Sequence, residues 1–270
     1  MAATTQQRVG WSTANIVAIL LALIPVVWIA SLSFKTPGSI TDPTFFPVHW
    51  TWANYSGILT TSTFIRPLIN SIGIGLIATF IAVVLASMAA YAVARLNFPG
   101  KSVLIGVSLL IAMFPAIALA TPLFQIERIL GLFNTWPGLI IPYVATGLPL
   151  GIYTLSAFFR EIPWELEKAA KVDGATPFQA FTRVIAPLAA PGMVTTAILV
   201  FLFCWNEFLF AITLTATLAA RTAPAALSAG RTTSIPVLMA GSFVSALPAI
   251  IVYLIFQRHL VKGLTMGMGK

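Results

Sequence analysis

The residues that could do chemistry gather in one stretch of the chain, 161–191, which reads EIPWELEKAAKVDGATPFQAFTRVIAPLAAP. This stretch holds four of the seven acidic residues of a chain that is 59% hydrophobic. It lies between two long apolar runs, and charge of this density must lie outside the lipid, where it is not costly. The chemistry that it offers is therefore contact with water or with another protein.

The first half of this stretch predicts a short helix that ends at a glycine. Pro163 suits the first turn of a helix, where its missing N–H is not needed. Glu165 and Glu167 then lie near the positive end of the helix dipole. The pair Asp173-Gly174 ends the helix, since glycine adopts the left-handed conformation without steric cost.

The second half predicts another helix directly after the glycine turn. Thr176 is the expected N-cap, Pro177 occupies the first helical position, and Gln179 completes a capping box. The unit is therefore a helix, a glycine turn and a helix outside the lipid, an arrangement that favours recognition by another protein.

The pattern EKAAKVDGA, followed by Phe181, Ile185, Pro187 and Pro191, resembles the EAA loop of permease subunits in ATP-binding-cassette (ABC) importers. The resemblance implies that residues 159–192 form a cytoplasmic coupling loop that sits in a groove on an ATPase. One position departs from the family pattern, because Lys168 stands where the family has its first glutamate. The contact residues that the resemblance implies are Glu165, Glu167, Lys168, Ala169, Ala170, Asp173, Gly174, Ala175 and Pro187.

A second polar group, the tetrad WNEF at 205–208, is expected in the middle of a membrane span. An ionised Glu207 facing lipid costs a few kcal/mol or more, so it must be neutral, paired or beside a wet cavity. Asn206 could hydrogen-bond sugar hydroxyls, and Trp205 could stack on a sugar ring. Adjacent helical residues point about 100° apart, so all three cannot face one cavity. Packing of Glu207 against a partner helix is an open alternative.

The elements that must position these groups are membrane helices. With 8% charged residues and a mean hydropathy of +0.96, the chain is not an ordinary soluble domain. We expect an all-α membrane protein with six transmembrane helices in one domain, 1–270, with no separate soluble domain. The six runs near the roughly 20 residues needed to cross a bilayer are 15–33, 68–92, 102–122, 137–158, 193–216 and 237–257.

The distribution of basic residues predicts the orientation. Placing both termini in the cytoplasm leaves ten of the fifteen Lys and Arg residues on that side, in keeping with the positive-inside rule. The same orientation places the coupling loop in the cytoplasm. The basic residues are scattered at helix ends rather than clustered on one face, so the net charge of +8 does not indicate a nucleic-acid partner.

Other motifs do not support an enzyme. The glycine pattern at 73–78 lies inside an apolar span, where close helix packing is its expected role rather than dinucleotide binding. The GKS at 100–102 lacks the first glycine of a phosphate-binding loop, so ATP must be bound by another polypeptide. His49 and His259 have no neighbour at metal-ligand spacing, and we expect neither a metal nor a cofactor in this chain.

The resemblance extends over nearly the whole chain, through the segments INSIGIG, AAYAVARLNFPGK and WNEF. It is strongest to MalG-like permeases of carbohydrate importers, and among them to the second permease of trehalose importers. It implies the type I ABC importer fold in a bacterial inner or plasma membrane and a heterodimer with a second, MalF-like permease. The other implied partners are an ATPase dimer that binds ATP and Mg, an extracytoplasmic sugar-binding lipoprotein, and membrane lipid.

Two alternatives are kept open. The chain could be an ABC permease for a solute other than a sugar, such as an amino acid or a metal complex. Residues 217–236 are the least family-like segment, which leaves the identity of the sugar open. It could also be a stand-alone channel or secondary transporter, which would leave the acidic coupling loop unexplained.

Overall fold

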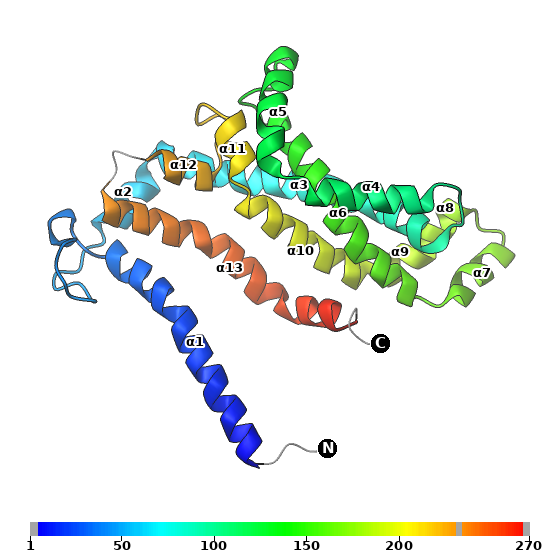
Figure 1. The fold of residues 1–270 in the computed structure, drawn as a ribbon, viewed down its shortest axis with the longest axis horizontal. Coiled ribbons are helices and arrows are strands. Elements are labelled where there is room, and N and C mark those ends of the chain that lie inside the picture. The colour runs from blue at the N-terminus through cyan, green and yellow to red at the C-terminus, as the bar shows by residue number, and fades with distance from the viewer. Residues whose placement is uncertain (1–4, 231–233, 267–270) are drawn as a thin grey trace. The chain divides into compact units, whose positions relative to one another are not determined.

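The computed structural model describes residues 5–230 and 234–266, and within them all regular structure is helical (Figure 1). The helices are α1 (Thr5–Ser33), η1 (Pro37–Ser39), α2 (Ala53–Thr60), α3 (Ser62–Arg95), α4 (Lys101–Met113), α5 (Ala116–Leu130), α6 (Trp136–Glu161), α7 (Trp164–Val172), α8 (Pro177–Ala180), η2 (Phe181–Ile185), α9 (Ala186–Leu188), α10 (Ala190–Asn206), α11 (Leu209–Leu214), α12 (Ala223–Ala229) and α13 (Ile235–Met266). The η1 segment is a 3-10 helix, and η2 is one turn of π-helix.

Four of the described helices are long and apolar enough to cross a membrane: Trp11–Ser33, Ser62–Arg95, Trp136–Glu161 and Ile235–Gln257. Two further pairs of helices qualify if each bent pair is one span, which brings the possible total to six. These pairs are Lys101–Met113 with Ala116–Leu130, bent by 93°, and Pro177–Leu188 with Ala190–Asn206, bent by 77°. The predicted all-α membrane fold is confirmed.

The structure differs from two predicted continuous helices. Within 102–122, α4 ends at Met113 and Phe114 is extended, because Pro115 follows it and disfavours the helical conformation in the preceding residue. Within 193–216, α10 ends at Asn206 and Glu207 is extended, with φ −68° and ψ 125°. The expectation that the WNEF tetrad lies within an unbroken helix is therefore wrong.

The described residues pack as two compact units, one of residues 5–65 with 227–230 and 234–247, the other of residues 66–226 with 248–266. In the first unit, the segment after α1 is held by a buried asparagine. The Asn54 side chain donates to the Ser33 and Lys35 carbonyls, at 2.8 and 2.9 Å. The ammonium group of Lys35 in turn donates to the Asp42 and Thr44 carbonyls, which satisfies this fully buried charge locally.

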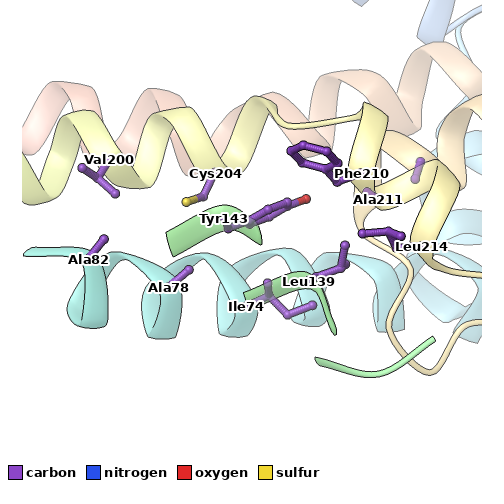
Figure 2. Packing of buried hydrophobic residues seen from close by; sticks show 11 residues of the cluster. Ile74, Ala78, Ala82, Leu139, Tyr143, Val200, Cys204, Phe210, Ala211 and Leu214 are labelled. Atoms are coloured by element: carbon purple, nitrogen blue, oxygen red, sulfur yellow. The ribbon is translucent and has the colours of Figure 1, made fainter. Parts of the chain in front are cut away.

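The second unit contains the coupling loop and has its core where α3, α6, α10 and α11 meet (Figure 2). Small residues on α3 let its neighbours approach closely. A Cβ on Gly73 would lie 2.3 Å from the Trp136 ring, and one on Gly75 would lie 3.2 Å from Phe201. The glycine pattern at 73–78 therefore serves helix packing, as predicted from its place in an apolar run.

Candidate functional site

The coupling loop folds as the predicted helix, glycine turn and helix. Gly174 lies between α7 and α8 with a φ of +86°, a left-handed conformation that favours glycine. The predicted capping box is confirmed: the Gln179 amide donates to Thr176 Oγ1 at 3.2 Å, and the Thr176 amide donates to Gln179 Oε1 at 2.9 Å. Both features are fixed by residues within the loop itself.

The loop has two arms, one on each side of Gly174, and the second arm packs against the membrane helices of the second unit. Phe181 and Ile185 are buried in a core with Tyr91 of α3 and Phe159 of α6. The ring centroids of Phe181 and Tyr91 are 4.9 Å apart, and those of Phe159 and Phe181 are 6.2 Å apart. The loop is therefore attached to the membrane helices through a hydrophobic core as well as through its two chain connections.

Helix α7 has an inner and an outer face. On the inner face Glu167 is only 1% exposed, so its side chain is turned away from any partner. The outer side carries Leu166 at 41% exposure and Val172 at 87%, and Phe178 beyond the turn is 65% exposed. A contiguous patch of exposed apolar side chains is typical of an interaction surface. Val172 and Phe178 flank the glycine turn of Gly174 in sequence.

The contact residues predicted from the motif separate by exposure. Glu167 is buried, whereas Ala170 and Ala175 are half-buried. The exposed ones are Glu165, Lys168, Ala169, Asp173, Gly174 and Pro187. Sequence reasoning missed Val172 and Phe178, although an apolar residue on each side of a polar turn was the signal that could have found them.

A cavity of about 810 Å³ lies in the second unit. Its lining comes from the end of α3 and from α4, α5, α6, α10 and α11, and is mostly apolar. The polar side chains among its lining residues are Ser108, Thr146, Tyr153, Ser156, Arg160 and Glu207. Ligand pockets commonly measure roughly 300–1,000 Å³ and combine apolar walls with a few polar groups, a description that this cavity meets.

Only Glu207 of the three predicted substrate-path residues lines this cavity. Trp205 is buried with its ring 5.7 Å from that of Phe201, and it contributes to packing. Asn206 is exposed, and its side-chain amide donates back to the Leu202 carbonyl at 2.8 Å. The aromatic side chains that line the cavity are Phe114, Tyr153, Phe203 and Phe210. Tyr153 is the most exposed of them, at 75%, and sequence reasoning missed it.

Glu207 also explains the break between α10 and α11. Its Oε1 accepts a hydrogen bond from the Phe210 amide at 2.9 Å, and its Oε2 accepts one from the Ala211 amide at 3.2 Å. These are two of the amides at the start of α11 that have no partner within the helix. The carboxylate thus meets backbone donors and a cavity instead of lipid, two of the favourable ways to place such a group inside a span.

The comparisons with known proteins agree with one another. Residues 82–266 match the family described as binding-protein-dependent transport system inner membrane component. The trehalose transport system permease protein SugB of Mycobacterium tuberculosis is 58% identical over 265 residues, which cover 96% of this chain and 97% of that protein. The trehalose/maltose transport system permease protein MalG of Thermococcus litoralis is 39% identical over 259 residues, with 93% of each covered.

The fold agrees as well. A bacterial ABC transporter that imports the acidic polysaccharide alginate contains a chain with a TM-score of 0.77 and 25% identity. The alignment covers 96% of this chain and 99% of that one. The similarity therefore extends over nearly the full length of both chains and not over one helical pair.

Membership of this family gives the chain its role. It is a multi-pass inner-membrane permease subunit of a binding-protein-dependent transport system, and ATP is bound by a separate subunit. The stand-alone channel or secondary transporter left open above is thereby set aside. The chain belongs to the inner membrane components of binding-protein-dependent transport systems, the permease subunits of ABC importers.

Proposed function

We propose that this permease imports a di- or oligosaccharide, with trehalose as the first substrate to test, in an ATP-driven complex. The observation that carries the proposal is the 58% identity, over nearly the full length, to a protein named as a trehalose permease. A second relative, at 39% identity, is named for trehalose and maltose. The runner-up is a permease for a solute other than a sugar.

The cavity supports a sugar as the cargo. Sugars present hydroxyl groups that need hydrogen-bond partners and faces of C–H groups that stack on aromatic rings. Ser108 and Thr146 bring hydroxyl groups to the cavity lining, and Glu207 brings a carboxylate. Tyr153 adds an exposed aromatic face to the same lining. We infer that this cavity is part of the half of the sugar path that this chain contributes.

The partners follow from the same proposal. They are a second, MalF-like permease, a pair of ATPases and an extracytoplasmic sugar-binding lipoprotein. The charge distribution supports an orientation with both termini in the cytoplasm. Arg95, at the end of α3, donates a hydrogen bond to the Ile162 carbonyl next to α7, so two segments predicted to be cytoplasmic lie together.

The coupling loop would transmit the state of the ATPases to the spans. Its exposed apolar residues Val172 and Phe178 are suited to a groove on a partner, and its buried side is fastened to the membrane helices. ATP binding would close the ATPases and move the loop, and the spans would change from inward-open to outward-open. Such coupling requires ATP to bind one state more tightly than the other.

The proposal can be tested by purifying the complex from its native membrane in a mild detergent and identifying the partners by mass spectrometry. We expect an ATPase with a phosphate-binding loop, a second permease and a binding lipoprotein. The retained binding protein is then titrated with trehalose and with a panel of amino acids. Saturable binding of an amino acid and none of any sugar would overturn the sugar proposal.

A first mutational prediction concerns the glycine turn. Gly174→Val places a β-branched residue at a φ of +86°, although no atom lies within 4 Å of the added Cβ. The cost is therefore backbone strain, of order 1–3 kcal/mol. We expect substrate-stimulated ATPase activity of the purified complex to fall by about tenfold or more, since 1.4 kcal/mol is a factor of ten.

Gly174→Asn is the matched control, because asparagine tolerates the left-handed conformation. It should retain most of the stimulation, measured per mole of assembled complex. Full stimulation and transport in Gly174→Val would contradict a rigid turn as the basis of coupling.

A further inference from the structure

Three polar side chains are buried together where α3 meets α7, and two of them belong to neither the predicted coupling surface nor the sugar path. Tyr91 and Arg95 lie in the last turns of α3 at 7% and 4% exposure, and Glu167 of α7 is 1% exposed. The fold brings Tyr91 and Glu167 together from positions 76 residues apart in the sequence. Burying charge in this way is costly unless the groups are paired, so their contacts carry information about what the cluster does.

Glu167 receives hydrogen bonds from both helices. The Tyr91 hydroxyl donates to Glu167 Oε1 at 2.9 Å, and the Lys171 ammonium lies 2.8 Å from the same oxygen. Lys171 is on α7 itself, one turn further on, and its side chain is 45% exposed. The Tyr91 bond is therefore the one that joins α7 to another element.

Arg95 holds the start of α7. It donates a hydrogen bond to the carbonyl of Ile162, the residue that follows α6. Its guanidinium also lies 4.6 Å from the ring centroid of Trp164, the first residue of α7. A guanidinium over an indole face is a favourable cation–π contact. Arg95 therefore adds a second contact between α3 and the start of α7, beside the bond from Tyr91 to Glu167.

Tyr91 contacts both arms of the coupling loop. Its hydroxyl meets Glu167 on the first arm, and its ring lies 4.9 Å from that of Phe181 on the second. The two arms also contact each other, since α7 packs against α8 and η2. Tyr91 therefore links both arms of the loop to α3.

The same helix is fastened at its other end. The Asn70 side chain donates to the Leu218 and Arg221 carbonyls, at 2.9 and 3.0 Å, and Ser71 Oγ accepts from the Ala223 amide at 2.8 Å. From residue 70 to residue 95, α3 is one continuous helix, roughly 37 Å long at 1.5 Å per residue. A displacement applied at Tyr91 would thus reach the segment 218–223 through a rigid element.

We propose that Tyr91 and Arg95 are positioning residues for coupling: with Glu167 they fasten α7 to α3, so that movement of the coupling loop moves α3 rather than bending the loop. This proposal rests on the proposed function of the loop as the ATPase contact. It assigns the buried Glu167 to attachment within the permease, while the exposed Val172 and Phe178 face the partner. Without the cluster, ATPase binding persists but its movement is not transmitted.

The test uses the intact purified complex in proteoliposomes and measures the number of ATP molecules hydrolysed per trehalose imported. Tyr91→Phe keeps the ring packing and removes only the hydroxyl. Loss of a hydrogen bond to a charged group should raise the ratio by roughly tenfold. The ATPase subunit should still co-purify in normal amount. Tyr253→Phe, at a side chain that is 49% exposed, is the matched control and should leave the ratio unchanged.

A double-mutant cycle identifies the contact. Glu167→Gln keeps an acceptor for the Tyr91 hydroxyl but loses the charge, and should raise the ratio less than Tyr91→Phe does. Adding Glu167→Gln to Tyr91→Phe should raise the ratio little further, because the effects of substitutions within one hydrogen-bond network are not additive.

Several results would overturn the proposal. A wild-type ratio of ATP hydrolysed to trehalose imported in Tyr91→Phe would do so. If that normal ratio came with a lower yield of complex, the hydroxyl would serve stability alone. Loss of the ATPase from the Tyr91→Phe complex would assign Tyr91 to docking and not to transmission. Absence of any ATPase from the wild-type complex would instead refute the proposed function, so the two failures are distinguishable.

Discussion

A complex whose permease carries Val172→Asp and Phe178→Asp together is expected to lose nearly all substrate-stimulated ATPase activity and transport. Val172 and Phe178 are 87% and 65% exposed on the coupling loop, and a patch of exposed apolar side chains is typical of a partner surface. The few hot-spot residues that dominate an interface cost about 2 kcal/mol or more each when truncated, and we expect Val172 and Phe178 to be such residues. Two such losses weaken ATPase docking by roughly a thousandfold if they add.

The measurement is ATPase activity of the complex with and without sugar-loaded binding protein, together with the amount of ATPase that co-purifies. Val48→Asp is the matched control, since Val48 is 64% exposed and lies outside the candidate spans. Wild-type stimulation in the double variant would show that this surface contacts lipid or solvent and that the ATPase docks elsewhere.

The second large effect is expected from Glu207→Ala. The change removes both acceptors from the Phe210 and Ala211 amides, which belong to residues that are 1% and 0% exposed. A buried donor left without a partner costs about 1–3 kcal/mol. The start of α11 should therefore shift, and because Glu207 and Phe210 line the cavity, we expect trehalose uptake to fall by about tenfold or more.

Glu207→Gln separates two explanations of this effect. The variant keeps one acceptor oxygen for the amides of α11 but loses the carboxylate charge in the cavity. If capping α11 is what matters, the rate of trehalose uptake should lie between those of the wild type and Glu207→Ala. If the charge is what matters, uptake should fall as far as in Glu207→Ala. Asp42→Ala is a suitable control for removing an exposed carboxylate outside the spans. Uptake at the wild-type rate in Glu207→Ala, at equal complex yield, would refute the role of Glu207 in shaping the cavity.

The coupling loop was predictable because its determinants are local. Thr176 and Gln179 are three residues apart and complete their capping box without help from the rest of the chain. Gly174 ends α7 for a reason contained in its own backbone, the positive φ. The membrane fold was predictable for a similar reason, since a run of apolar residues is a property of the sequence itself.

The unpredicted parts depend on side-chain contacts that neither the hydropathy nor the loop motif encodes. In the sequence, Tyr91 is one aromatic residue in an apolar run. Only the fold shows that it lies beside Glu167, which is 76 positions away. Glu207 was expected within a continuous helix because the hydrophobicity of 193–216 has no gap. The break arises from hydrogen bonds that its carboxylate makes to the next turn, an interaction that hydropathy does not register.

The most direct test of ATP-driven sugar import is uptake of labelled trehalose by proteoliposomes that hold the purified complex, with ATP trapped inside and binding protein outside. We predict uptake that requires both ATP and the binding protein, is suppressed by excess unlabelled trehalose, and is lost with Val172→Asp and Phe178→Asp. Uptake that proceeds equally without ATP would contradict the account, as would import of a non-sugar solute by a complex that imports no di- or oligosaccharide.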